Sequence, residues 1–131
     1  MKLLPLLAGV LACARPLVAQ VTATATLHDG VATVLVGNST KTALTVSVSL
    51  WRDATRPGGP VTLGDSLPAR ISPQSFVLPA GQIQTVRLKV HAAVTPHELL
   101  RLVTLLDPPP PTKGAVQLAV RMRIISRVVV S

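Results

Sequence analysis

The chain has 131 residues, which is enough for one domain with its own core but too few for two well-packed domains. Apolar residues make up 48% of it, a share that excludes a wholly disordered chain. The net charge of +8 suits nucleic acid, anionic lipid or an acidic protein, but Trp51 and Phe76 are the only aromatic residues, so binding of nucleic acid by base stacking is excluded.

The N-terminal segment is typical of a secretory signal peptide. Lys2 supplies one positive charge, residues 3–14 are an apolar run, and small residues follow. This run is shorter than the roughly 20 residues that span a bilayer, so we expect export and no stable membrane span. Cleavage after Ala19 would leave a mature domain over residues 20–131.

Cys13 is the only cysteine of the chain, and two outcomes are open for it. The segment Val10-Leu11-Ala12-Cys13 weakly resembles a lipoprotein cleavage box, which would give a lipid anchor. Removal of Cys13 with the signal peptide is the interpretation that we favour. In both cases the mature domain forms no internal disulfide, so packing must stabilise it.

The mature chain begins with the period-two alternation of half-buried strands. Residues 21–27 alternate Val, Ala and Leu with Thr and predict the first strand. The turn His28-Asp29-Gly30 follows, because Asp-Gly tolerates the positive φ that hairpin turns require. Residues 31–36 and 44–51 predict the next two strands. The second of these has an apolar face made of Leu44, Val46, Val48 and Leu50.

The middle of the chain predicts a loop, short strands and one longer strand. Residues 54–70 are rich in Pro and Gly and predict a loop with a short edge strand at 61–63. A short strand is expected at 76–78. Residues 83–90 predict a longer strand whose apolar face is Val86, Leu88 and Val90.

Two long strands are expected to complete the domain. Residues 99–106 are more continuously apolar, which predicts a central strand that is covered on both faces. Asp107 and four prolines end it. Residues 116–124 predict the last long strand, with a tail through 127–130. The whole pattern predicts an all-β protein with an immunoglobulin-like β-sandwich of about seven strands.

No set of side chains predicts a catalytic or metal site. His28, His91 and His97 share no ligand spacing. The carboxylates are scattered over turns and strand ends, where such groups usually cap or solvate loops. We therefore expect that the protein is not an enzyme and that it holds no metal and no cofactor.

Three stretches follow one another in a characteristic order. Residues 71–88 read ISPQSFVLPAGQIQTVRL, residues 98–109 form a strand that ends in paired prolines, and residues 116–124 read VQLAVRMRI. Trp51 lies late in the third predicted strand. Together these features resemble the N-terminal domain of the periplasmic pilus (fimbrial) chaperones. The resemblance covers most of residues 31–127 and implies an immunoglobulin-like sandwich in the periplasm.

The resemblance also implies a way of binding. A pilin-like subunit lacks its last strand, and a chaperone of this family supplies one, whose backbone pairs with the subunit and whose apolar side chains fill the groove. The same alternation would equally serve a strand in the domain's own core. The residues expected to fill the groove or to steer an acidic partner beside it are Val116, Leu118, Val120, Met122, Arg121 and Arg123.

The chain departs from the family's pattern at three places. The family binds the subunit's terminal carboxylate with an arginine on the first strand and a lysine on the last. Here the first strand has no arginine, and Ile125 stands at the lysine position. The family also continues into a second immunoglobulin-like domain beyond the position of Ser131. The alternative function is a structural or adhesive envelope component that self-associates through an exposed edge.

Overall fold

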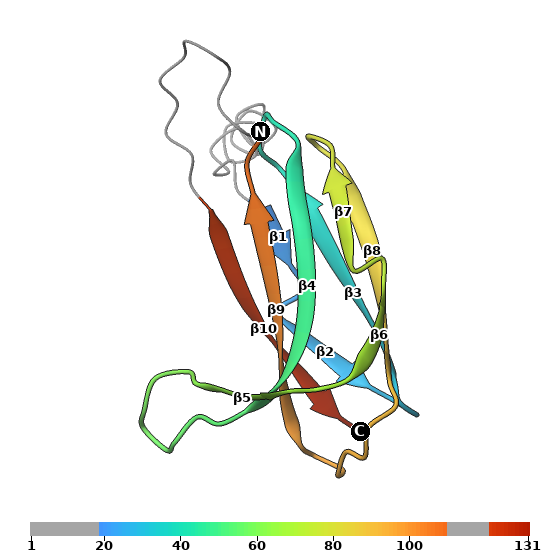
Figure 1. Cartoon of the computed structure of the whole chain (residues 1–131), viewed down its shortest axis with the longest axis vertical. Helices are drawn as coiled ribbons and strands as arrows, with labels where there is room; N and C mark the ends of the chain where they lie inside the picture. Colours follow the sequence, from blue (N-terminus) through green and yellow to red (C-terminus); the bar gives the residue numbers. More distant parts are fainter. Residues whose placement is uncertain (1–18, 110–120) are drawn as a thin grey trace, which may run out of the picture.

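Alternating apolar and polar residues fold the chain into ten strands that form two sheets (Figure 1). The computed structural model describes residues 19–109 and 121–131. This part of the chain contains no helix, and so none that is long and apolar enough to cross a membrane. The predicted all-β, immunoglobulin-like sandwich is confirmed. The predicted signal peptide and Cys13 lie outside the described residues.

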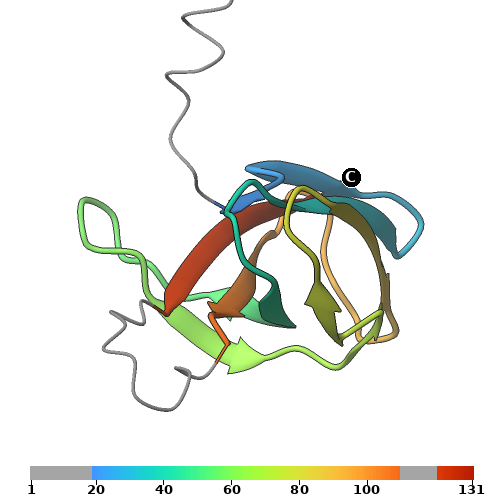
Figure 2. The same cartoon turned by 90° about the horizontal axis from the view of Figure 1, so that it is seen from above.

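The two sheets differ in size and lie face to face, as the end-on view of Figure 2 shows. The smaller sheet has the order β1-β3-β8-β6, made of β1 (Ala19–Val21), β3 (Val31–Asn38), β8 (Ile83–Val90) and β6 (Ala69–Ser72). The larger sheet has the order β2-β10-β9-β4-β5, and β7 also pairs with β4. Its strands are β2 (Thr24–Leu27), β10 (Met122–Val130), β9 (Leu99–Asp107), β4 (Leu44–Asp53), β5 (Leu63–Ser66) and β7 (Ser75–Leu78).

An aliphatic core lies between the sheets. The predicted apolar face of β4 is buried, and none of its four side chains is more than 3% exposed. The apolar face of β8 is buried in the same way, while Thr85, Arg87 and Lys89 point to solvent. As predicted, β9 is a central strand, since it pairs with β10 on one side and β4 on the other. It is not covered on both faces, because its outward side chains Leu99, Arg101 and Leu105 are only half-buried. Burial of the core side chains is the main source of stability in a domain without a disulfide.

The predicted first strand over residues 21–27 is wrong in one respect, because it is two strands in different sheets. β1 pairs antiparallel with β3, and β2 pairs parallel with β10. The chain changes sheet between Thr22, whose N–H donates to the carbonyl of Leu35, and Ala23, whose carbonyl accepts from the N–H of Arg127. Alternation has the same period in both sheets, so it does not reveal the change. The turn that follows is confirmed, with positive φ at Asp29 and Gly30.

The predicted last strand over residues 116–124 is confirmed at residues 122–124. In the described part of the chain the strand runs from Met122 to Val130 and joins the predicted tail without a break. Residues 116–120 lie outside the described residues. Two further short strands, β5 and β6, lie within or next to the region predicted as a loop. The strand number therefore rises above the expected count.

One polar side chain in the core gives a stability prediction. Thr104 is fully buried, and its hydroxyl has no hydrogen-bond partner among the described residues. A buried unsatisfied hydroxyl costs about 1–3 kcal/mol, so the isosteric change Thr104→Val should raise the free energy of unfolding by about 1 kcal/mol. Urea unfolding measures this, with exposed Thr45→Val as the control. A loss of stability would show that the hydroxyl has a partner, such as a buried water.

Candidate partner-binding edge

Half of β10 has a strand on only one side. β10 pairs with β9 from Met122 to Val129, but it pairs with β2 only from Arg127 to Val130. On the side of β2, residues 122–126 therefore have no neighbouring strand among the described residues. Figure 1 shows this half of β10 at the margin of the sheet. We call residues 122–126 the open edge.

The backbone of the open edge presents hydrogen-bonding groups away from β9. The N–H of Arg127 donates toward β2, to the carbonyl of Ala23 at 3.0 Å, whereas the N–H of Val130 donates to the carbonyl of Glu98 on the opposite side at 3.0 Å. Because these groups alternate along a strand, the N–H and C=O of Arg123 and Ile125 point to the unpaired side. These are the groups that an added strand would use.

Beside the open edge, the side chains that face the core are more exposed to solvent. Met122 and Ile124 point inward and pack against the core, but each stays half-buried. Farther along the same face, Ser126 and Val128 are buried. The core is therefore more accessible to the side chains of a bound strand at the open edge than at the end of β10 that pairs with β2.

The structure places the predicted site residues in three different situations. Val116, Leu118 and Val120 lie outside the described residues. Arg121 precedes the strand, and its guanidinium is paired with Asp107 of β9. Met122 and Arg123 belong to the open edge, and the side chain of Arg123 is exposed. Sequence reasoning did not include Ile124 and Ile125 among the site residues, although the apolar residues at 124, 125 and 128–130 already indicate that the strand extends past 124.

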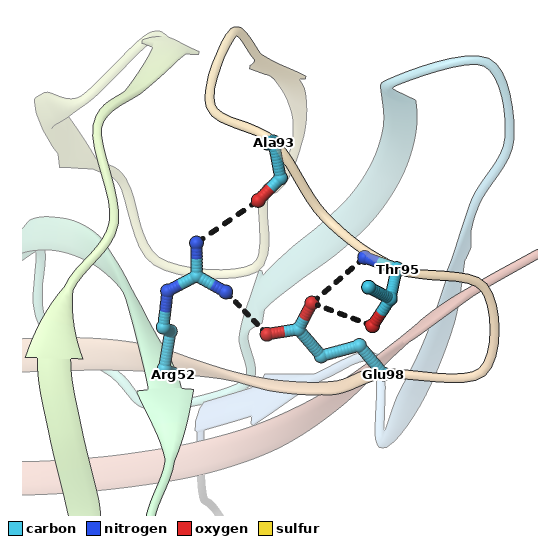
Figure 3. Close-up of polar contacts among 4 residues, drawn as sticks. All are labelled: Arg52, Ala93, Thr95 and Glu98. Carbon is cyan, nitrogen blue, oxygen red and sulfur yellow. Dashed lines mark hydrogen bonds and ion pairs between the residues drawn. The ribbon is translucent and has the colours of Figure 1, made fainter.

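A polar cluster lies at the opposite end of β4, where the β8–β9 connection passes (Figure 3). Arg52 forms an ion pair with Glu98, and its second amino group donates to the carbonyl of Ala93 at 3.0 Å. The other carboxylate oxygen of Glu98 accepts from the N–H of Thr95 at 2.9 Å. Both oxygens of the carboxylate are thus engaged within the cluster, which suits a structural role better than proton transfer. No three His, Cys, Asp or Glu side chains of the described residues are grouped to hold a metal.

Two carboxylates make the stability pH-dependent. The hydrogen bond from the N–H of Thr95, together with Arg52, lowers the pKa of Glu98. The hydroxyl of Thr55, together with Arg101, lowers the pKa of Asp53. A carboxylate with a lowered pKa in the folded state protonates first in the unfolded chain, so its contribution is present above the ordinary carboxyl pKa of about 4 and is lost below it.

We therefore expect the urea midpoint to fall as the pH drops from 5 to 3. The Glu98→Gln and Asp53→Asn double variant should be less stable at pH 7 and should show a smaller fall. If the urea midpoint falls equally in the unmodified protein and in the double variant, other groups cause the pH dependence.

Comparisons with known proteins bear on the fold of the domain. No family model matches the chain, and no curated protein matches it in sequence. Solved structures do match, among them the complex of the Salmonella enterica SafA pilin with the SafB chaperone, at a TM-score of 0.70 and 18% identity, covering 88% of this chain and 55% of that one. The E. coli chaperone DraB matches with a TM-score of 0.65 and 14% identity, again over 88% and 55% of the two chains. The domain has the pilus-chaperone fold.

The pilus-chaperone fold also occurs elsewhere. A PapD-like domain of human CEP192 matches with a TM-score of 0.52 and 13% identity, over 88% of this chain and 87% of that one. The present chain spans about half the length of the pilus chaperones that it matches. At such identities the shared property is the fold, so function must be argued from the open edge.

Proposed function

We propose that the protein is an exported, non-enzymatic, chaperone-like binding protein that captures a pilus or other envelope subunit by strand addition. The observation that carries this proposal is the open edge, where residues 122–126 of β10 pair with β9 but with no second strand in the described part of the chain. Solved structures of similar fold include a pilin–chaperone complex and a chaperone–tip adhesion subunit complex, and another is named a periplasmic chaperone. These support a protein subunit as the partner and the periplasm as the location after removal of residues 1–19.

The bound strand would lie along the open edge. Its backbone would pair with the N–H and C=O groups of Arg123 and Ile125. These main-chain hydrogen bonds supply affinity that does not depend on the partner's side chains. Its apolar side chains would lie beside Met122 and Ile124, on the less closed side of the core. Val116, Leu118 and Val120 would extend the contact along the preceding segment.

Charge would assist the approach of an acidic subunit. The side chain of Arg123 is exposed, and it forms no ion pair among the described residues. Arg121 already neutralises Asp107, so it contributes less to the net field at the edge. Such rim charges change association rates more than final affinity.

A photo-crosslinking residue at position 123 tests the proposal. The tagged protein is produced in its own cells, irradiated, and recovered from the envelope for mass spectrometry. The same residue at Thr45, exposed on β4, is the matched control. We expect an adduct with one envelope subunit at 123 and none at 45. Adducts only between copies of this chain would favour the structural component, and equal labelling at both positions would contradict the proposal.

A further inference from the structure

The outer face of the smaller sheet holds three cations that lie close together. Arg70 of β6 is directly opposite Lys89 of β8, and Arg87 lies two residues before Lys89 on the same face. With Val31 and Ser72 they line a depression of about 260 Å³. Like charges placed directly opposite each other destabilise a sheet. The free domain therefore bears a cost that a bound anion would remove.

No Asp or Glu side chain of the described residues forms an ion pair with this cluster. All five acidic residues of the chain lie in its described part. Asp65 belongs to β5 of the other sheet. Three others form ion pairs elsewhere: Asp53 with Arg101, Glu98 with Arg52, and Asp107 with Arg121. Asp29, at the nearby turn, lies 3.5 Å from the ring of His28 and forms no ion pair with the three cations.

The same face is apolar beyond the cations. Leu35 of β3 is 49% exposed and Ile83 of β8 is 70% exposed. Leu35 is opposite Thr85, and Ile83 lies two residues before Thr85, so both side chains are neighbours on the face that carries Arg87. One side of the sheet is thus basic at one end and aliphatic at the other.

We infer that this face is a docking surface for an anionic membrane, with lipid phosphate groups at Arg70, Arg87 and Lys89. Leu35 and Ile83 would enter the boundary between headgroups and acyl chains. Cations near an anionic leaflet and exposed aliphatic side chains are the two components of peripheral membrane binding. Neither aromatic residue of the chain lies on this face, which disfavours single-stranded nucleic acid. A purely acidic polypeptide would engage the cations but would give no role to Leu35 and Ile83.

Residue-resolved NMR of the chain without residues 1–19, the exported form proposed above, tests the inference. Amide shifts are followed during titration with bicelles containing phosphatidylglycerol, with bicelles of phosphatidylcholine alone, and with inorganic phosphate. We expect saturable shifts at Ser72, Arg87, Leu35 and Ile83 with the anionic bicelles and none at these residues with bicelles of phosphatidylcholine alone. Inorganic phosphate should shift residues 70–72 and 87–89 weakly and leave Leu35 and Ile83 unchanged.

Two pairs of substitutions separate a specific site from net charge. Arg87→Gln with Lys89→Gln should weaken binding to the anionic bicelles about tenfold or more, since each cation near the surface contributes about a factor of five. Arg56→Gln with Arg127→Gln removes the same charge from exposed positions off this face and should change binding much less.

Several results would overturn the inference. Equal weakening in both double variants would mean that only net charge matters. Equal shifts with uncharged bicelles would remove the role of the cations. Shifts by phosphate as strong as those by the anionic bicelles would indicate a free-anion site. Tighter binding of polyglutamate at the same residues would indicate an acidic protein partner.

Discussion

Arg123→Pro should weaken partner binding about tenfold to a hundredfold, whereas Arg123→Ala should change it by no more than about threefold. The N–H of residue 123 points away from β9, so proline removes no hydrogen bond of the β9–β10 ladder. It does remove the donor that an added strand needs, and its ring fills that space. An unpaired carbonyl on the partner then costs about 1–3 kcal/mol, which corresponds to the expected loss.

Comparing the two variants separates the contribution of the backbone N–H to binding from that of the arginine side chain. Both lack the arginine side chain, so any difference between them reports the backbone edge. Affinity for the captured subunit is measured by titration, and urea midpoints check that both variants remain folded. Equal affinity of the two variants would contradict strand addition at the open edge.

Asn38→Ala should lower the free energy of unfolding by about 3 kcal/mol. Asn38, at the end of β3, is 1% exposed. Its amide group donates to the carbonyls of Thr42 and Leu78, each at 2.9 Å, and its carbonyl accepts from the N–H and hydroxyl of Thr40. Alanine would remove one donor to the buried carbonyl of Leu78 and would leave the N–H and hydroxyl of Thr40 without their acceptor. A loss of this size is a large part of the about 5–15 kcal/mol that stabilises a typical domain.

Two further variants test the cause of that loss. Ser39→Ala, at the exposed next residue, should change stability by less than about 0.5 kcal/mol. Asn38→Asp keeps the acceptor for Thr40 but turns a carboxylate oxygen toward two carbonyls, so it should be at least as destabilising as alanine at pH 7. Urea unfolding measures all three, and a loss below about 1 kcal/mol in Asn38→Ala would contradict the bonding described here.

The alternation of apolar and polar residues correctly predicted the strands that have one face toward the core and the other toward solvent. β4 and β8 alternate strictly, and their apolar faces are buried as expected. The change of sheet between β1 and β2 was not predictable, because residues 21–27 keep one alternation on both sides of it. β5 was placed too early, since Gly64 and Asp65 have low strand propensity and pairing with β4 decides their conformation.

The candidate site depends on which strands pair with each other more than on the local pattern of apolar and polar residues. The resemblance pointed to the last strand, but the open edge exists because β2 covers only residues 127–130 of β10. Nothing in residues 122–126 encodes how far β2 reaches. The three cations of the outer face were likewise unremarkable in sequence, because Arg70 and Lys89 become neighbours only through the pairing of β6 with β8.

Amide hydrogen exchange at the open edge tests the central claim most directly. In the free protein the amides of Arg123 and Ile125 should exchange rapidly, while those of β9 are protected. When the captured subunit is bound, both amides should become protected, because their N–H groups then donate to the added strand. If they still exchange rapidly with the subunit bound, the subunit does not dock by strand addition at β10, and the proposed function is wrong.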